Sequence, residues 1–564
     1  MILAYEFEYV SGNLVLESFL RVISEEFGVK YTICREKNVT TLYIDEDEEK
    51  QHEFADFLSS NLPLSLFLKS SNAKVVDSIK GKELDFVNTA LSLPFTKKAI
   101  ELAKDKESFF YKSPFVPNEV GFSDISQKTT LTLESKDGVV VANDSAGYEE
   151  MYKNVANLIK EGERVNIKTP NGIFSFFRVQ KGAFEGINEF EIMPTDLSLV
   201  QKAVNIRENE IHTLICLEKP ILRAKVNMVF ESMEILPTSR VKIRVANTPL
   251  LHFICEELYA NGVEFIAKSP EISDSSPLLS YDIDIPEIID IEVSILENGE
   301  IFVLNTDKYA PIDIKSQLDK LKEPSVKQFV SILKERDLFG DKTSCFYFSK
   351  KYDDAIMYHD EERELLSFTK FPNHFNSIRD IFAEIKKQDE SGEKLVENYK
   401  KVYPELYKSI QRVKIPKKIP NNLFSTMKFL SVIVGFSEDF QTAADTLIEK
   451  AEDFGGQKGV RIDFRLMEEE KIKSDFNPYR LIRSAMSFKL AGTDDMTLSF
   501  GVLESFSYFV SDMADALKET VGSQKVTLGG SLFAYPIITE LVAKNLLPNH
   551  KIYFNLALPI ELGH

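Results

Sequence analysis

The chain has 564 residues, of which 68 are lysine or arginine and 88 are aspartate or glutamate, so its net charge is −20. This acidic balance repels phosphate backbones and anionic leaflets, which excludes nucleic acid and membrane surfaces as favoured partners. A chain of this length is too long to pack around a single hydrophobic core, so we expect three or four domains.

No basic region of a signal peptide begins the sequence, and its apolar runs are too short to cross a bilayer. We therefore expect a cytoplasmic protein without membrane insertion. The four cysteines form no C-x-x-C pair, which indicates buried thiols rather than a disulfide framework or a zinc site.

The first eighty residues alternate strand and helix patterns in the order βαββαβ. The hydrophobic periodicity predicts strands at 4–10, 30–34 and 40–44, an amphipathic helix at 14–27, and a second helix from the acidic run 45–49 to residue 62. The acidic run is typical of a solvated helix start that the helix dipole favours. Residues 85–145 are rich in serine, lysine and aspartate and indicate a linker, with a small strand pair around 129–133 and 139–141.

A helix at 149–160 and a strand at 165–168 open the next segment, which we place at residues 146–320. Short runs with distinctive residues follow in order: Phe190-Glu191-Ile192-Met193, Lys219-Pro220-Ile221, Asn247-Thr248-Pro249-Leu250, Ala267-Lys268-Ser269 with Ser273, and Asp307-Lys308-Tyr309-Ala310-Pro311.

The last segment, residues 321–564, carries patterns for strands, long helices and a glycine turn. We expect strands at 344–349 and 355–358, helices at 365–387 and 394–414, a hinge at 415–420, and a helix at 506–521 that packs in a core. The pair Gly529-Gly530 follows a strand. It permits two interpretations, because glycines let backbone N–H groups approach a phosphate closely but also occur in ordinary strand-to-helix turns.

The end of the chain gives the most specific pattern: Lys525-Val526-Thr527-Leu528, Gly529-Gly530, Ser531-Leu532-Phe533, and finally Leu558-Pro559-Ile560-Glu561-Leu562-Gly563-His564. Together with the ordered runs before it, this end resembles the HypF-type hydrogenase maturation carbamoyltransferases, in which a Ser-Gly-Gly-Val-Phe turn precedes a final Pro-Asn-Asp-Gly-Gly. The resemblance covers nearly the whole chain. It implies an α/β and α+β multidomain fold with an acylphosphatase-like module of ferredoxin type (1–84), a linker in place of the zinc-finger region (85–145), a YrdC-like domain (146–320) and a split actin-like ASKHA domain (321–564).

In the first module of that family an arginine cradles the acyl phosphate and an asparagine orients the attacking water. Alignment on Phe19 puts Glu17 at the arginine position and Arg35 near the asparagine position. A carboxylate there would repel the substrate dianion by an amount on the order of several kcal/mol in a partly dry site. We therefore expect no hydrolysis of carbamoyl phosphate. No cysteine or histidine lies within 85–145, so no zinc is expected either.

The YrdC-like domain of the family binds ATP and makes a carbamoyl-adenylate, with cationic side chains on the phosphates. The resemblance implies five candidate residues for binding ATP or AMP: Lys168, Ser269, Ser273, Gly529 and Gly530. Two departures put triphosphate binding in doubt. The basic cluster before the Phe-x-x-Met run is reduced to Lys181, and the family's Ser-Gly-Asn reads Ser269-Pro270-Glu271.

The last domain of the family holds a metal between a His-His-x-Ala-His helix and the final Asp. Here the two histidine positions four apart read Asn373 and Ser377, the middle one stays His374, and the Asp position reads Glu561. Because one histidine and one glutamate do not complete a coordination shell, we expect no metal site and assign no catalytic residue.

Three hypotheses follow. The first is a divergent HypF relative, such as the HydE type, that has lost carbamoyl phosphate hydrolysis and metal-dependent carbamoyl transfer. It would bind HypE-type maturation proteins or an immature [NiFe] hydrogenase subunit, an inference by analogy with the family. The second is a residual ATP-dependent carbamoyl or related acyl transferase that uses Lys168, Ser269 and the Gly529-Gly530 turn on a protein or small-molecule acceptor. The third is an unrelated metabolic enzyme, which a structure without the initial βαββαβ module or the actin-like fold would favour.

Overall fold

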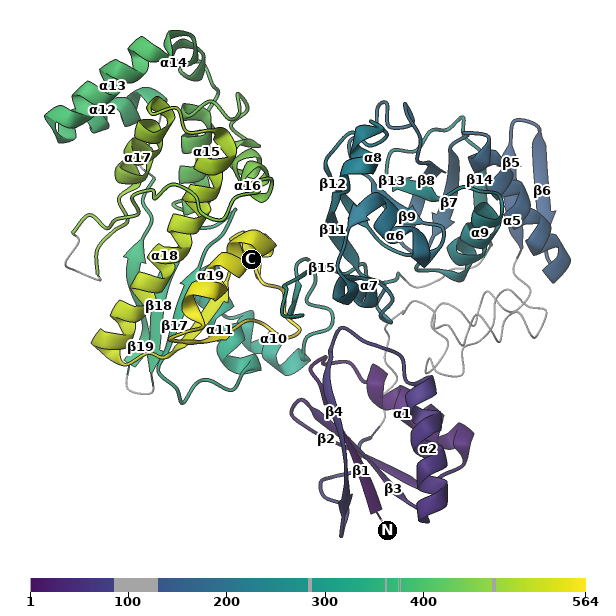
Figure 1. Ribbon diagram of the computed structural model, residues 1–564. Coiled ribbons are helices and arrows are strands. Elements are labelled where there is room, and N and C mark those ends of the chain that lie inside the picture. The colour runs from purple at the N-terminus through teal and green to yellow at the C-terminus, as the bar shows by residue number, and fades with distance from the viewer. Residues whose placement is uncertain are drawn as a thin grey trace. The chain divides into compact units, whose positions relative to one another are not determined.

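The computed structural model describes residues 2–85, 130–282, 287–360, 363–373, 375, 377–468 and 473–563. The chain divides into two compact units, Met1–Val293 with Asn305–Pro311 and Ser294–Leu304 with Ile312–His564. Each unit combines sheets with covering helices (Figure 1). The predicted multidomain α/β architecture is therefore confirmed, and no helix among the described residues is long and apolar enough to span a bilayer.

The first unit begins with a four-stranded sheet in the order β2-β3-β1-β4. Its elements in chain order are β1 (Ile2–Tyr9), α1 (Val15–Phe27), β2 (Tyr31–Glu36), β3 (Val39–Asp45), α2 (Glu48–Asn61) and β4 (Leu68–Val76). This is the βαββαβ order that the sequence predicts, with both helices on one face of the sheet (Figure 1). The acidic run does begin a helix, because Asp47 caps α2 by accepting a hydrogen bond from the backbone N–H of Lys50 at 3.0 Å.

A second, larger sheet of the first unit runs in the order β15-β11-β12-β9-β13-β8-β7-β14-β5-β6, with β10 paired to β11. Its strands are β5 (Leu131–Ser135), β6 (Gly138–Ala142), β7 (Val165–Thr169), β8 (Gly172–Arg178), β9 (Glu191–Pro194), β10 (Val204–Asn205), β11 (Ile221–Val226), β12 (Arg240–Ile243), β13 (Phe265–Ser269), β14 (Leu278–Tyr281) and β15 (Glu292–Ile295). The predicted strand pair around 129–141 is present as β5 and β6. It extends this sheet rather than standing alone in a linker, because β5 also pairs with β14.

The helices of this second sheet are α5 (Ser145–Lys160), η1 (Leu197–Leu199), α6 (Val200–Ala203), α7 (Glu208–Leu214), α8 (Met228–Ser232) and α9 (Pro249–Ala260). Helices α5 and α9 pack on each other and cover one face, where the rings of Tyr152 and Phe253 stack at 5.8 Å. Their apolar side chains and those of the central strands form a continuous buried core.

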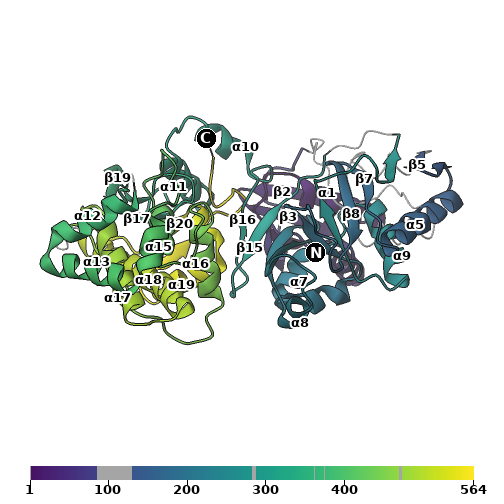
Figure 2. The same cartoon turned by 90° about the horizontal axis from the view of Figure 1, so that it is seen from above.

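The second unit has a five-stranded sheet in the order β19-β18-β17-β20-β21. Its elements are β16 (Ile301–Val303), α10 (Ile312–Leu318), α11 (Pro324–Glu335), β17 (Thr343–Tyr347), β18 (Ala355–Asp360), β19 (Arg363–Lys370), α12 (Ile378–Gln388), α13 (Glu390–Val402), α14 (Pro404–Ile410), α15 (Leu423–Ile433), α16 (Ala443–Glu452), α17 (Pro478–Leu490), α18 (Asp495–Val521), β20 (Lys525–Gly529), η2 (Ser531–Ala534), α19 (Pro536–Leu546) and β21 (Lys551–Tyr553). Strand β20 is parallel to both of its neighbours, β17 and β21. Helices α12, α13 and α17 lie side by side in both views (Figures 1 and 2).

Two predicted helices of the second unit are wrong at their boundaries. Residues 363–370 form β19 instead of the start of a helix, because they pair with β18 in an antiparallel hairpin and Pro372 then prevents helical continuation. The helix begins only at Ile378, after the Ser377 side chain accepts a hydrogen bond from the Asp380 N–H. The predicted helix 394–414 is divided into α13 and α14, since Pro404 has no N–H to continue the first helix.

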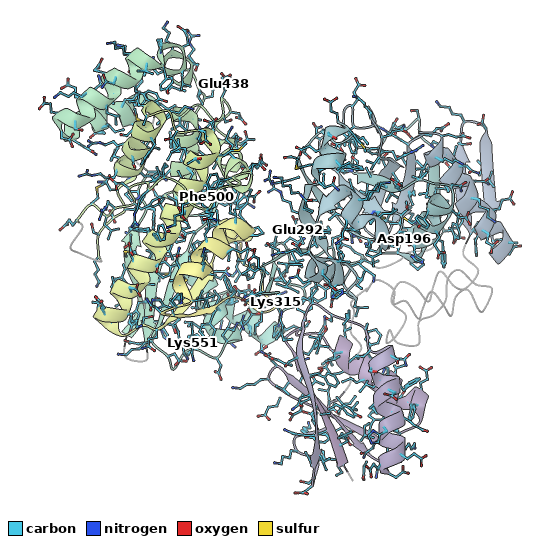
Figure 3. The ribbon with its side chains drawn as sticks, viewed as in Figure 1. Asp196, Glu292, Lys315, Glu438, Phe500 and Lys551 are labelled. Atoms are coloured by element: carbon cyan, nitrogen blue, oxygen red, sulfur yellow. The ribbon has the colours of Figure 1, made fainter. Side chains whose placement is uncertain are left out.

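The long helix α18 has 27 residues and forms the centre of the second unit's core. The sequence places six side chains of this helix on its core face: Phe509, Val510, Met513, Ala516, Leu517 and Val521. Four of them are buried, while Ala516 and Val521 are half-buried. Near the start of α18, Phe500 stacks on Phe454 at 4.7 Å in the helical part of the unit (Figure 3). The cysteines Cys34, Cys216, Cys255 and Cys345 are buried free thiols, as the sequence predicts.

Candidate functional site

A buried ion pair between Glu17 on α1 and Arg35 on β2 lies beside the loop before α1, where the sequence places a degenerate acyl phosphate site. Nη1 of Arg35 donates to Oε1 of Glu17 at 2.8 Å, and the hydroxyl of Thr40 donates to the same oxygen at 2.6 Å. Glu17 has no exposed surface. Burial raises the pKa of Glu17, while the positive charge of Arg35 and the Thr40 hydrogen bond oppose that rise.

The same guanidinium also binds backbone carbonyl oxygens of the loop. Arg35 donates to the oxygens of Tyr9 at 3.2 Å, Ser11 at 2.5 Å and Asn13 at 3.3 Å. The N–H of Gly12 donates to the Tyr309 carbonyl at 2.7 Å. The loop carbonyls and the Glu17 carboxylate of α1 therefore surround a cation, a charge pattern opposite to that of an oxyanion site.

Lys168 and Ser269 lie at the C-terminal ends of β7 and β13, two central strands of the larger sheet separated by β8, and Ser273 lies in the loop after β13. Asn166 lies opposite Ser175, which in turn lies opposite Ser269, so Lys168 and Ser269 share a face of the sheet. The Asn166 amide donates to the Ser273 carbonyl at 2.9 Å, which ties the Ser273 loop to β7.

Each of these three side chains has a partner within the chain. Nζ of Lys168 donates to the Tyr281 carbonyl at 3.0 Å and lies 4.7 Å from the centre of the Tyr281 ring. The hydroxyl of Ser269 donates to the carboxylate of Glu271, and the Ser273 hydroxyl lies 2.9 Å from that of Ser275. A nucleotide phosphate bound by these three residues would have to displace these contacts.

A cluster of four charged side chains on and beside these central strands was missed from the sequence. Nη1 of Arg244 lies 2.6 Å from Asp290 and 3.6 Å from Glu191, and Nζ of Lys268 lies 3.6 Å from Glu191 and 3.9 Å from Asp290. Arg244 is only 1 % exposed. Burial lowers the pKa of Lys268, and the two cations hold the pKa of Asp290 below its ordinary value although burial opposes the charged carboxylate.

This four-charge cluster balances two cations with two carboxylates. Because the cluster carries no net charge, it offers little attraction to an incoming phosphate. Its members lie on β9, the end of β12, β13 and the segment before β15, so only the fold brings them together. A lysine inside the strand run Phe265-Ile266-Ala267-Lys268 was the signal that could have revealed it.

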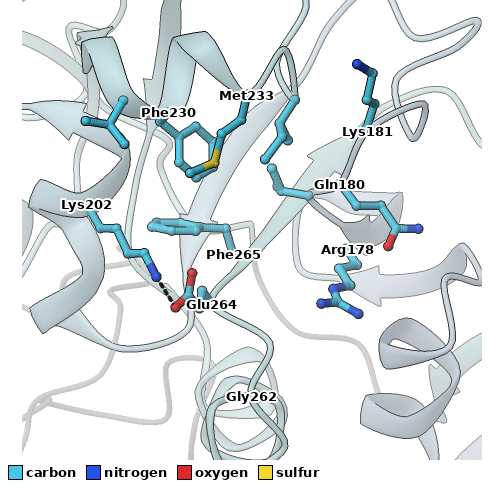
Figure 4. A pocket seen from close by; sticks show the side chains of 12 residues that line it. Arg178, Gln180, Lys181, Lys202, Phe230, Met233, Gly262, Glu264 and Phe265 are labelled. Atoms are coloured by element: carbon cyan, nitrogen blue, oxygen red, sulfur yellow. Dashed lines mark hydrogen bonds and ion pairs between the residues drawn. The ribbon is translucent and has the colours of Figure 1, made fainter.

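A pocket of about 560 Å³ lies elsewhere in the first unit (Figure 4). Its lining residues are Arg178, Val179, Gln180, Lys181, Lys202, Val229, Phe230, Met233, Ile235, Gly262, Glu264 and Phe265. Phe230 and Phe265 meet edge to face at 5.6 Å, and Lys202 pairs with Glu264. Lys181, the basic residue noted in the sequence, pairs with Glu234 at 3.0 Å. Two of the three cations around this pocket thus have a carboxylate partner.

The glycine turn of the second unit is closed by the end of the chain. Gly530 has φ 101°, and its N–H donates to the Ile560 carbonyl at 2.7 Å. Both the N–H and the hydroxyl of Ser531 donate to Oε2 of Glu561, at 2.9 Å and 2.8 Å. The amides that could cradle a phosphate therefore bind a carbonyl and a carboxylate of the same chain. A Cβ at Gly529 would lie only 2.7 Å from Cγ of Gln328, so a side chain has no room at this position.

The positions that match the family's metal-binding histidines have structural roles here. Asn373 donates to the carbonyls of Pro420 and Asn422 and accepts from the Thr426 hydroxyl, while Ser377 caps α12. His374 lies outside the described residues. Across the part of the chain that the structure describes, no group of three or more histidine, cysteine, aspartate and glutamate side chains suits a metal ion.

Two lysines of the second unit, one of which contacts the glycine turn, were not singled out from the sequence. Nζ of Lys350 donates to Asp445 at 3.0 Å and to the Tyr535 hydroxyl at 2.6 Å, and its backbone N–H donates to the Ser531 hydroxyl at 2.9 Å. Lys350 and Lys428 both lie over the Phe424 ring, at 5.0 Å and 5.2 Å. Burial lowers the pKa of Lys428, and the neighbouring Lys350 charge adds to this shift.

Comparison with known proteins places this geometry in a context. No family model matches the chain. The chain is 25 % identical over 529 residues to "Protein HydE" of Wolinella succinogenes, with 91 % of each chain covered. Its fold is similar to a crystal structure of full-length HypF in the phosphate- and nucleotide-bound form (TM-score 0.65, 14 % identity, 99 % of this chain and 96 % of that chain). It is equally similar to HypF of T. kodakarensis (TM-score 0.65, 11 % identity, 98 % and 95 % covered). The resemblance to HypF indicated by the sequence motifs is therefore confirmed, and the chain has a HypF-like fold over nearly its whole length.

Proposed function

We propose that this chain is a cytoplasmic accessory factor of hydrogenase maturation that has lost carbamoyl phosphate hydrolysis and metal-dependent carbamoyl transfer. In this proposal its modules, acylphosphatase-like, YrdC-like and ASKHA-like, act as binding surfaces. The similarity to Protein HydE and the HypF-like fold support the link to hydrogenase maturation. Its partner would be a HypE-type maturation protein or an immature [NiFe] hydrogenase subunit.

The observation that carries the proposal is the pairing of Arg35 with Glu17. Hydrolysis of an acyl phosphate requires donors directed at the phosphoryl oxygens. Here the guanidinium of Arg35 instead donates to the buried Glu17 carboxylate and to three backbone carbonyls. An acyl phosphate at that position would meet acceptors where it needs donors.

The other two predicted anion positions support the same conclusion. Glu271 accepts from Ser269 and Glu561 accepts from Ser531, so each serine is held by a carboxylate of the chain itself. Displacing such a contact would bring a phosphate close to a negative charge, which raises the cost of binding.

The test is carbamoyl-phosphate-dependent conversion of ATP to AMP and pyrophosphate by the purified chain, with a HypE-type acceptor present and absent and HypF as the positive control. We expect no turnover above a no-protein blank. Binding of the HypE-type protein and of the immature hydrogenase subunit is measured in parallel by titration calorimetry. Turnover comparable to HypF would refute the loss of activity, and failure to bind either protein would refute the accessory role.

The second candidate is a residual ATP-dependent carbamoyl or related acyl transferase. Lys350 and Lys428 favour this candidate, because both lie over the ring of Phe424 and two neighbouring lysines could hold a phosphate. The backbone N–H of Lys350 also binds Ser531 of the glycine turn. A phosphate- and nucleotide-bound form is described for the similar HypF. Under this hypothesis ATP or AMP binds with an affinity that falls at least about tenfold in Lys168→Ala or Lys350→Ala. Equal binding by the variants and the unchanged chain would exclude these lysines from the site.

A further inference from the structure

Strand β6 forms one edge of the larger sheet in the first unit, next to β5 and with no strand on its outer side among the described residues. Its sequence is Gly138-Val139-Val140-Val141-Ala142. The three valines are 63 %, 48 % and 57 % exposed, so apolar side chains face solvent on both sides of the strand. In Figure 1 this strand lies at the outer end of its sheet.

Such an edge is unusual, because an open edge offers unpaired backbone N–H and C=O groups to any other strand, and proteins normally protect it with charged residues. The other sheets follow that rule. Each of their edge strands β2, β4, β19 and β21 contains a lysine or an arginine. Strand β6 contains no charged residue at all.

The sequence around β6 is complementary to itself. When two copies of the strand pair antiparallel about a two-fold axis at Val140, Val140 faces its own counterpart and Val139 faces Val141 of the second copy. In the same register Gly138 faces Ala142, so small residues meet beyond the valines. All three valine positions thereby gain an apolar cross-strand neighbour.

Charges just outside the strand also match in this register. Lys136 lies in the turn before β6 and Asp144 follows the strand, so at each end of the paired strands Lys136 of one copy comes near Asp144 of the second. Both residues are exposed. The Asp144 carboxylate accepts from the Gly147 N–H at 2.7 Å as the cap of α5, which holds it at the start of that helix. At each end of the paired strands a lysine and a carboxylate of different copies can therefore form an ion pair.

We propose that β6 is a self-association surface at which two copies of this chain join their sheets by antiparallel pairing centred on Val140. A two-fold interface of this kind is closed, because each copy uses its edge once. A pair of five-residue strands is smaller than a standard protein interface, so the dimer is weak and depends on protein concentration. The inference does not rest on the proposed role in hydrogenase maturation.

The test is sedimentation velocity of the full chain from the low to the high micromolar range. We expect a monomer–dimer equilibrium whose dissociation constant rises about tenfold or more in Val140→Lys, because two like charges then meet at the axis. Met228→Lys is the matched control. It changes an 82 % exposed apolar residue on α8 to the same charged side chain and should leave the equilibrium unchanged.

A cysteine variant tests the register independently of stability. Val140→Cys should form a covalent dimer under mild oxidation, since the four native cysteines are buried, whereas Met228→Cys should not. A monomer at every concentration would overturn the proposal and leave the edge to a strand of another protein. A dimer that Val140→Lys does not weaken, or equal cross-linking of both cysteine variants, would also overturn it.

Discussion

Arg35 and Glu17 are joined by a contact of 2.8 Å in which the carboxylate has no exposed surface and the arginine side chain is only 13 % exposed. Removing one partner of such a pair leaves an uncompensated charge in a buried position. We expect Glu17→Ala to reduce the free energy of unfolding of the N-terminal module by about 3–5 kcal/mol. Guanidinium denaturation followed by circular dichroism measures this loss.

Glu26→Ala is the control, since Glu26 lies on the same helix α1 but is exposed, and its change should be within about 0.5 kcal/mol. The double change Glu17→Leu with Arg35→Met should recover most of the loss, because it removes both charges together. Equal effects of Glu17→Ala and Glu26→Ala would show that the buried pair contributes nothing to stability.

Glu17→Arg should not create acylphosphatase activity. The new guanidinium would lie beside Arg35 and repel it, and the position aligned with the water-orienting asparagine would still be an arginine. Hydrolysis of benzoyl phosphate, a chromogenic acyl phosphate, tests this expectation against a genuine acylphosphatase. Measurable turnover by the single variant would mean that the loop can bind an acyl phosphate after all.

Gly530→Ala should strongly destabilise the second unit. A Cβ at this position would lie 2.2 Å from the Phe348 carbonyl oxygen, and φ 101° is unfavourable for any residue with a side chain. We expect a loss of about 3 kcal/mol or more in the free energy of unfolding. Gly455→Ala is the control, because nothing lies within 4 Å of its Cβ position. Similar melting temperatures for the two variants would contradict the predicted strain.

Asp354 should make the second unit less stable as pH rises. Burial raises the pKa of this carboxyl well above its ordinary value, although it accepts hydrogen bonds from the backbone N–H groups of Ser349 and Leu423. The folded chain therefore keeps the proton at pH values where the unfolded chain, with a pKa of about 3.9, has lost it. By linkage, stability decreases as pH rises through that window.

Asp354→Asn removes this titration. Its melting temperature relative to the unchanged chain should increase as pH rises above the unfolded pKa of about 3.9, and this difference should level off once the pH exceeds the raised pKa of the folded chain. Differential scanning calorimetry at matched ionic strength measures the difference. A difference that stays constant with pH would show that the Asp354 pKa is the same in the folded and unfolded chain.

Glu335 should hold the last residues of the described chain in place. Its carboxylate accepts from the N–H groups of Leu556, Ala557 and Leu558 at 2.8–2.9 Å, and from the side-chain amide of Asn555 at 2.8 Å. Glu335→Ala leaves these buried donors without an acceptor, at a cost of about 3 kcal/mol or more. Hydrogen exchange of residues 555–562 should accelerate. The exposed Glu323→Ala, just before α11, should leave that exchange unchanged.

Hydrophobic periodicity predicted the elements of this fold well where one face of a strand or helix is buried and the opposite face is exposed to solvent. The βαββαβ module and the core face of α18 are examples. It failed at β19, where the residues 363–370 have no strong helical or strand pattern of their own and the pairing with β18 decides the outcome.

The candidate site was only partly accessible from the sequence. Alignment identified Glu17, Arg35 and Glu561 as changed positions, but it treated each as the loss of a ligand. The structure adds what each residue binds instead. Glu17 and Arg35 are 18 residues apart, and Glu561 reaches Ser531 across 30 residues. Such pairings depend on how strands and loops meet, and no local pattern contains that information. The Arg244 cluster was missed for the same reason.

The order of the strands in the second unit has a consequence for biosynthesis. Strand β20 lies between β17 and β21, yet the contacts that join it to β17 span about 181 residues of chain. Closing so long a loop is slow, and until β20 leaves the ribosome the edge of β17 has no neighbour to cover it. The sheet of this unit can therefore form only after nearly the whole unit has been synthesised. During that interval the nascent chain is the state most exposed to aggregation and most dependent on chaperones.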